Sequence, residues 1–411
     1  MHDRTGDDLF SAEEKWLFSA LSQVLRDLGE DRAAWERRPA PDWNRFLQLA
    51  RCHAVLPLLY QLSEMDEIPG DVRRSIAVES RRTVQQSYRL MFLTHYVVEK
   101  LERAEIRAAV LKGVAAADCY PVPELRKSGD IDLLLVDVEK CSEAERVMKA
   151  AGFRKNEEQH AGHHQVWRTD EGIDIELHTA LAEDFDNRMV NEILNRQLAA
   201  MAGRMRREAV MGLEFPVLAE GDHAYFLLLH MLHHFLRAGF GIKLLCDWVV
   251  FWNGCHSETE IRRYVDQIAE TGLEGFSDMV TCLCARYLGL SEECAGRILG
   301  RTFGSTECQA FMRDILDGGE FGTREGERMV AVRGGGLTGY MREFHHQMCL
   351  NFPKKSKIPV LWPALWLAAA ARFLRNNRKQ REISTFRVLK KAGERGRKLK
   401  SLELFRVRGK R

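Results

Sequence analysis

Two aspartates separated by one residue, Asp130 and Asp132, stand at the start of an apolar run that extends to Val136. Such a run predicts a buried strand, and alternate residues of a strand point to the same face, so both carboxylates should point the same way. Neighbouring carboxylates repel each other, and a fold normally keeps such a pair only where a cation or a protonation role offsets the charge. We therefore expect a divalent metal at this position.

A second set of acidic residues follows about forty positions later. Apolar and polar residues alternate there, which predicts another strand with Asp174, Glu176 and His178 on one face. A third carboxylate beside the aspartate pair would complete an oxygen-rich site for Mg²⁺. Either Asp174 or Glu176 could supply it.

The segment before the aspartates is typical of a phosphate-binding turn. Residues 106–111 predict a short strand that ends at Lys112 and Gly113 and runs into a helical stretch over residues 114–117. Glycine lets the backbone approach a ligand closely, and a helix N-terminus offers free N–H groups. Lys112 adds a positive charge at the same place.

These residues resemble a known family, the uncharacterised nucleotidyltransferases of the polymerase-beta-like superfamily. Enzymes of that superfamily transfer a nucleoside monophosphate from an NTP to an acceptor, with two metals held by three carboxylates. The resemblance covers most of the chain, although its specific motifs lie within residues 111–178. Those motifs are Leu111-Lys112-Gly113, Arg126-x-x-Gly129-Asp130-Ile131-Asp132-Leu133-Leu134 and Ile175-Glu176-Leu177-His178.

The resemblance implies a role for each motif. Asp130 and Asp132 would hold both metals, Mg²⁺ or Mn²⁺, and Glu176 would hold the metal that activates the acceptor and accept its proton. Lys112 with the Gly113 backbone would position the triphosphate. We favour Glu176 over its neighbour two residues earlier as the third ligand, because it stands next to Leu-His in the family pattern.

Three further residues are candidates for nucleotide contact: Arg126, Gly129 and His178. Arg126 pairs either with an NTP phosphate or with an acidic residue. His178 shares its strand face with Glu176, so it could also touch the acceptor. The chain departs from the wider superfamily in two ways, since Lys-Gly replaces the usual Gly-Ser and the third carboxylate is a glutamate where an aspartate is commoner.

Other polar residues have less specific surroundings. We interpret the histidines at positions 230, 233 and 234 as packed or hydrogen-bonded, because no acidic or cysteine partner is spaced to complete a zinc site. A further histidine cluster, at positions 160, 163 and 164, precedes the strand that ends in His178. Asp247 lies in an apolar helical stretch and needs a partner if buried, which leaves a structural ion pair or a substrate-pocket role.

The expected fold class is α+β, with a small mixed-sheet nucleotidyltransferase core embedded in a largely helical protein. Helical periodicity dominates before residue 105 and again after residue 186. We expect four segments: an N-terminal helical region (1–105), the α/β core (106–185), a C-terminal helical domain (186–340), and an apolar then basic helical tail (341–411).

Composition favours a cytoplasmic protein with no transmembrane segment. The chain has 411 residues, 45% of them hydrophobic, and its ten cysteines include no CxxC pair, so we expect reduced thiols. The polar first eight residues do not resemble a signal peptide. The apolar run over residues 358–371 is too short to cross a bilayer.

The charge is unevenly distributed. Residues 372–411 contain sixteen Lys or Arg against three Glu, a charge of +13, so an overall charge of +2 leaves −11 on the rest. Such a tail could contact a polyanion, or it could be an amphipathic helix that docks on the body.

We expect an Mg²⁺-dependent nucleotidyltransferase that uses an NTP, with a hydroxyl or similar nucleophile on a small-molecule, sugar or peptide acceptor. The alternative is a catalytically inactive module that binds a nucleotide or a partner and uses its basic tail for RNA or an anionic surface.

Overall fold

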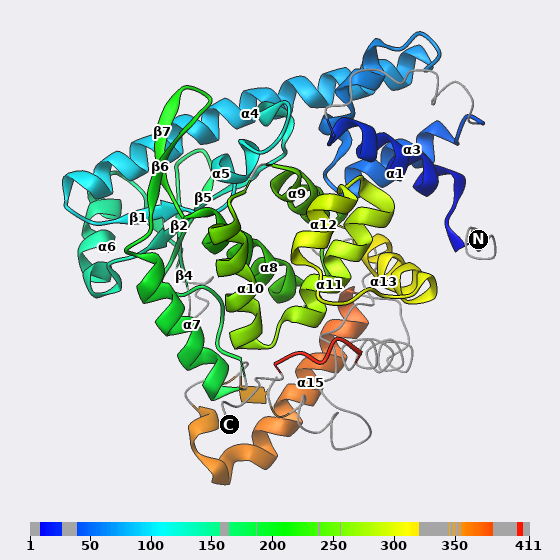
Figure 1. Cartoon of the computed structure of the whole chain (residues 1–411). Coiled ribbons are helices and arrows are strands. Elements are labelled where there is room, and N and C mark those ends of the chain that lie inside the picture. The colour runs from blue at the N-terminus through cyan, green and yellow to red at the C-terminus, as the bar shows by residue number, and fades with distance from the viewer. Residues whose placement is uncertain are drawn as a thin grey trace.

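The computed structural model describes residues 9–26, 39–156, 164–185, 187–236, 239–254 and 256–319, and beyond these residues 345, 348, 349, 352, 355–380 and 401–405. It confirms the α+β class, with one mixed sheet among many helices (Figure 1). In this part of the chain no helix combines the length and apolarity needed to cross a bilayer. The predicted basic tail lies mostly outside these residues.

The N-terminal part is helical, as its periodicity predicts, and consists of α1 (Ala12–Val24), α3 (Trp43–Cys52), η2 (Leu56–Glu64) and α4 (Gly70–Arg103). Helix α4 is long because its sequence contains no proline and no glycine after its first residue. Val72 and Ile76 near its start pack in the same core as α1 and α3, whereas Leu90 and Val97 pack in the core of the sheet. It therefore connects the two cores.

The sheet has seven strands: β1 (Ala108–Val110), β2 (Asp130–Leu135), β3 (Arg154–Lys155), β4 (His164–Arg168), β5 (Asp174–His178), β6 (Arg206–Val210) and β7 (Leu213–Val217). Their spatial order is β3-β4-β5-β2-β1-β7-β6. The pairs β2–β5 and β1–β7 are parallel, and the others are antiparallel. Between the strands lie α5 (Val114–Ala117), η3 (Pro123–Leu125), η4 (Val138–Lys140), α6 (Cys141–Ala150) and α7 (Arg188–Met201).

The sheet continues past residue 185, the predicted end of the α/β core. Residues 215–218, which the sequence suggests as an extended connection, mostly belong to β7, and β7 pairs with β1 through Val217 and Val110. Strand β6 is the sheet edge and carries charged residues, and β7 contains Pro216. Charges are common on edge strands, whereas proline is unusual in an inner strand such as β7, and both obscure the pattern that reveals a strand in sequence.

Helices cover both faces of the sheet. Ile131, Leu133 and Leu135 of β2 pack in one core with α4 and α6. Leu134 points to the opposite face and belongs to the core that contains α8 and α9. The alternation of side chains along β2 thus places Asp130 and Asp132 on the face that meets the C-terminal helices.

The C-terminal helices follow the sheet. They are α8 (Glu220–Leu236), α9 (Ile242–Asn253), α10 (Glu258–Thr271), α11 (Glu274–Leu283), η6 (Cys284–Leu288), α12 (Glu292–Ile298) and α13 (Ser305–Gly318), followed after a gap by η8 (Lys355–Lys357), η9 (Pro359–Leu361) and α15 (Trp362–Gln380).

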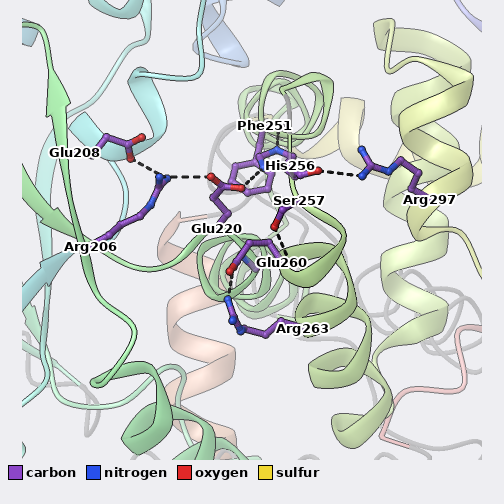
Figure 2. A network of polar contacts seen from close by, with 10 residues as sticks. Arg206, Glu208, Glu220, Phe251, His256, Ser257, Glu260, Arg263 and Arg297 are labelled. Atoms are coloured by element: carbon purple, nitrogen blue, oxygen red, sulfur yellow. Dashed lines mark hydrogen bonds and ion pairs between the residues drawn. The ribbon is translucent and has the colours of Figure 1, made fainter.

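A polar network joins the sheet edge to these helices (Figure 2). Arg206 of β6 contacts Glu208 on its own strand at 3.1 Å and Glu220 at the start of α8 at 3.4 Å. Glu220 also accepts a hydrogen bond from His256 at 2.9 Å, and the His256 carbonyl accepts one from Arg297 of α12 at 3.0 Å. The network holds β6 against α8 and α12.

A buried ion pair makes a second connection. Arg126, just after η3, donates to Asp247 of α9 from Nε at 2.7 Å and from Nη2 at 2.8 Å, and both side chains are less than 5% exposed. Tyr120 also donates to this carboxylate, at 2.7 Å. Two parallel N–H···O hydrogen bonds thus connect the loop before β2 to helix α9 of the helical domain.

Replacing Asp247 tests this connection. We expect Asp247→Asn to lower the free energy of unfolding by about 3–5 kcal/mol, because the Arg126 charge would then be buried without a counter-charge. Urea denaturation measures the change. The matched control is Asp170→Asn, which breaks the exposed Arg154–Asp170 pair and should cost less than about 1 kcal/mol. Equal losses in the two variants would contradict the role given to the buried pair.

Candidate active site

The parallel register of β2 and β5 brings the acidic residues together. Asp130 pairs with Asp174, Asp132 with Glu176, and Leu134 with His178. Paired residues in neighbouring strands share a face, so the two rows of polar side chains lie side by side. The carboxylates of Asp130, Asp132 and Glu176 each place an oxygen within 4.8 Å of the other two.

Asp132 is at the centre of this cluster and is only 2% exposed. Its Oδ1 lies 2.8 Å from Lys112 Nζ and 3.1 Å from His178 Nε2. Burial raises the pKa of Asp132, but the Lys112 charge and the His178 hydrogen bond outweigh it and hold the pKa below its usual value. Its Oδ2 is buried without a hydrogen-bond partner among the described residues. A buried carboxylate oxygen in this state is a ready ligand for a cation.

Lys112 stands at the turn that follows β1. Leu111 N–H donates to the Asp132 carbonyl at 3.1 Å, which places the turn beside the start of β2. Burial would lower the pKa of Lys112, but the nearby carboxylates of Asp132, Asp130 and Glu176 outweigh it and raise the pKa. The ammonium therefore stays charged and offsets part of the negative charge.

Gly113 is required by the backbone at this turn. Its φ of +57° and ψ of −109° lie in a region that L-residues with side chains avoid. The helix after it, α5, is a single turn, so the N-terminal donors expected there come from a short element. Gly129 has no positive φ, and a Cβ there would meet no atom within 4 Å. The backbone therefore gives no reason for glycine at position 129.

Glu176 and His178 extend the cluster along β5. Glu176 is one-quarter exposed, and its Oε2 lies 3.3 Å from His178 Nε2. Burial raises the pKa of Glu176, but the His178 hydrogen bond and the Lys112 charge outweigh it and lower the pKa. Burial lowers the pKa of His178, but its hydrogen bonds to Asp132 and Glu176 outweigh it and raise the pKa. The pair is therefore stabilised in its charged form.

Asp174 lies outside this cluster. Its carboxylate accepts two hydrogen bonds from Arg168, at 2.6 and 2.7 Å. The structure thus gives Asp174 its own partner at the sheet surface, and it places Glu176 beside the aspartate pair.

Arg126 forms the ion pair that the sequence left as one of two alternatives. Besides Asp247, its guanidinium donates to Ser128 Oγ at 2.6 Å. Its main contacts are thus within the protein, and they position the loop that leads into Asp130. The same ion pair gives Asp247 the partner that a buried carboxylate needs.

A pocket lies beside the Lys112–Gly113 turn, where β1 ends and β2 begins. Helix α4 forms one wall through Ser87, Leu90 and Thr94. Asp130 and Asp132 are also part of its lining, so the pocket adjoins the start of the strand that carries the acidic cluster.

Sequence reasoning assigned no role to His164, which the structure brings to the site. Antiparallel pairing of β4 with β5 sets His164 opposite His178, with ring centroids 5.1 Å apart. Residues 164–168 show no regular alternation of polar and apolar side chains, so only the pairing of β4 with β5 shows that His164 faces the site. The neighbouring histidines at positions 160 and 163 lie outside the described residues.

Helix α8 approaches the same place. The Phe226 ring lies 6.4 Å from that of His178 and stacks on His230 at 6.2 Å. Desolvation, with the Lys112 charge next in effect, holds the pKa of His230 well below its usual value. His230 and His234 pack edge to face at 4.4 Å.

The charge balance around Asp132 predicts a pH-dependent effect of Lys112→Met. Because Lys112 lowers the pKa of Asp132 in the folded protein, the stabilisation is present above the unfolded pKa of about 3.9 and is lost as the pH falls through the folded value. We expect a loss of about 3–5 kcal/mol near neutral pH and a smaller loss below about pH 4.

Urea denaturation across this pH range measures the effect. Lys155→Met is the matched control. Lys155 lies outside the cluster, and its ammonium pairs with the Glu145 carboxylate at 2.6 Å. A loss for Lys112→Met that does not change with pH would argue against the charge balance.

Comparison with known proteins gives the family. Residues 39–289 match the family model described as "Uncharacterised nucleotidyltransferase". Among solved structures, the crystal structure of an antigenic nucleotidyltransferase-like protein from Paracoccidioides brasiliensis matches with 15% identity and a TM-score of 0.33, and the match covers 51% of this chain and 93% of that one. No curated protein matches. Since the family model spans 251 of the 411 residues, the chain belongs to the uncharacterised nucleotidyltransferase family.

Proposed function

We propose that this protein transfers a nucleoside monophosphate from an NTP to a hydroxyl or similar nucleophile on a small-molecule, sugar or peptide acceptor, with Mg²⁺ or Mn²⁺ held by Asp130, Asp132 and Glu176. The observation that carries the proposal is the convergence of these three carboxylates, each with an oxygen within 4.8 Å of the other two. Asp132 adds a buried oxygen, Oδ2, that has no hydrogen-bond partner among the described residues. Carboxylate oxygens are the ligands that Mg²⁺ and Mn²⁺ prefer.

The metal would polarise the phosphoryl group and neutralise charge during transfer. The protein's own contribution is placement. Lys112 lines the pocket and lies 2.8 Å from Asp132, so its ammonium can contact a phosphate that enters beside Gly113. The pocket itself holds about 10 Å³, room for about one water molecule, so we assign to it a single phosphate oxygen or a metal-bound water and not the whole NTP.

The pKa directions refine the role of Glu176. A carboxylate whose pKa is lowered stays ionised and is a weaker proton acceptor, which suits a metal ligand better than a base. Asp174 supports the same choice, because Arg168 already binds both of its oxygens. We therefore assign the third ligand position to Glu176, and the expectation that it also takes the acceptor's proton loses support.

The aromatic residues of the core favour a small acceptor. The three within residues 111–178, Tyr120, Phe153 and Trp167, are all buried. Single-stranded nucleic acid usually binds by stacking bases on accessible aromatic side chains, and none of these rings is placed for that. A contact between residues 372–411 and a polyanion stays a prediction.

Asp130→Asn is a clean test of metal and nucleotide binding. Asp130 is half-buried and makes no side-chain hydrogen bond or salt bridge within the described part of the chain, so the change removes charge without breaking a contact. We expect Mn²⁺-dependent ATP affinity, measured by calorimetry, to fall by more than about tenfold. The free energy of unfolding should change by less than about 0.5 kcal/mol. If the wild-type protein binds none of the four common NTPs with either metal, the proposed function is wrong.

Glu176→Gln and Asp174→Asn separate the two carboxylates of β5. We expect Glu176→Gln to lower turnover by more than about a hundredfold. Losing a residue that only supports a metal ligand already lowers activity by about 10- to 100-fold, and losing a direct ligand should cost more. Asp174→Asn breaks only the exposed Arg168 pair and should lower turnover by less than about fivefold. Pyrophosphate release with pooled sugar and peptide acceptors measures both, and the reverse order would move the ligand assignment to Asp174.

A further inference from the structure

A second group of possible metal ligands adjoins the three carboxylates and has a different chemistry. It consists of His164 on β4 with Glu176 and His178 on β5, and each residue places a donor atom within 4.8 Å of the other two. The three side chains share one face of the sheet, because His164 and His178 are directly opposite in the antiparallel pair.

The donor types favour a transition metal. Two imidazole nitrogens and one carboxylate suit Zn²⁺ and its neighbours in the first row, whereas Mg²⁺ takes oxygen ligands. Catalytic zinc sites commonly use three protein ligands of this kind and leave a fourth position open.

The distances fit such an ion. Ligands about 2.0–2.1 Å from a tetrahedral zinc lie about 3.3 Å from one another. Glu176 Oε2 and His178 Nε2 are already 3.3 Å apart. Nε2 also faces Asp132 Oδ1 at 3.1 Å, so a zinc ion bound there displaces the Nε2 proton to solvent and takes its place between these groups. A donor nitrogen of His164 lies within 4.8 Å of donor atoms of Glu176 and His178, and a change of its side-chain rotamer is the movement that would bring it to ligand distance.

The surroundings allow both access and selectivity. Glu176 is one-quarter exposed, which gives an ion a path from solvent. His178 is 7% exposed, with the Phe226 ring of α8 on one side and the buried Asp132 carboxylate 3.1 Å from its Nε2. Low exposure and a nearby negative charge both strengthen the attraction between a cation and these donors.

We propose that His164, Glu176 and His178 form a second metal site that binds Zn²⁺ or a similar first-row transition ion and shares Glu176 with the carboxylate cluster. The site depends on its three donors, and it would exist whether or not the chain transfers nucleotides. Sharing Glu176 makes the two sites compete for one carboxylate, so zinc should weaken Mn²⁺-dependent ATP binding.

Zinc affinity of the full-length protein tests the proposal. We expect His164→Gln and His178→Gln each to weaken Zn²⁺ binding by more than about tenfold, as measured by competition with a chromogenic chelator. Co²⁺ in place of zinc should give the visible absorption of a site with nitrogen and oxygen ligands, and each variant should lose it.

Two controls separate this site from its neighbours. Asp130→Asn removes a residue of the carboxylate cluster alone and should leave zinc affinity within about twofold, while it weakens Mn²⁺-dependent ATP binding. His95→Gln removes another half-buried histidine, which packs on Phe215 on the other face of the sheet, and should also leave zinc affinity unchanged.

Three results would overturn the proposal. The first is that His164→Gln and His178→Gln leave zinc affinity unchanged, and the second is that Asp130→Asn lowers zinc affinity as much as they do. The third is a thiolate-to-cobalt charge-transfer band, which would place the ion on cysteines. His178 is buried, so His178→Gln could unfold the protein. The zinc affinity of His164→Gln, at a half-buried position, therefore decides the first result. Zinc binding that persists in a protein that binds no NTP would refute the proposed function alone.

Discussion

The burial of Asp132 sets the condition that the rest of the site meets. A carboxylate removed from water is costly unless cations and hydrogen bonds compensate for it. Lys112 arrives from the turn after β1, and His178 arrives from β5, so the order β5-β2-β1 in the sheet brings both to the same oxygen. The central position of β2 is thus what allows a charged residue to be buried here. The second oxygen, Oδ2, is left without a hydrogen-bond partner among the described residues.

The described helices after the sheet add no carboxylate to the acidic cluster, but they cover it. The face of the sheet that carries the acidic residues belongs to the same core as α8 and α9, and the Arg126–Asp247 pair fixes α9 against the loop before β2 (Figure 1). Helix α8 brings Phe226 and His230 close to His178. Desolvation and the nearby Lys112 charge keep His230 neutral, so it adds no further positive charge beside the cluster.

Glu176 belongs to both groups of possible metal ligands. The carboxylates of Asp130 and Asp132 come from β2 on one side of it and the His164 imidazole from β4 on the other, while His178 follows on β5 itself. Hard and softer cations prefer different donors, so the two groups would suit different ions. The parallel register of β2 with β5 brings the first group together, and the pairing of β4 with β5 brings the second together.

The sequence by itself determined the local elements and the residue types of the site. Alternation over 130–136 and 173–178 predicted two strands with their acids on one face, and the glycine turn after residue 111 was visible because few residues other than glycine adopt its backbone. Strands β6 and β7 were missed, since edge charges and Pro216 hide their pattern. Only the tertiary structure decided that β2 and β5 are parallel neighbours, that Asp174 belongs to Arg168, that Arg126 belongs to Asp247 and that His164 joins the site. Strand pairing and ion pairing between distant segments depend on how buried surfaces meet, and local periodicity contains no information on that.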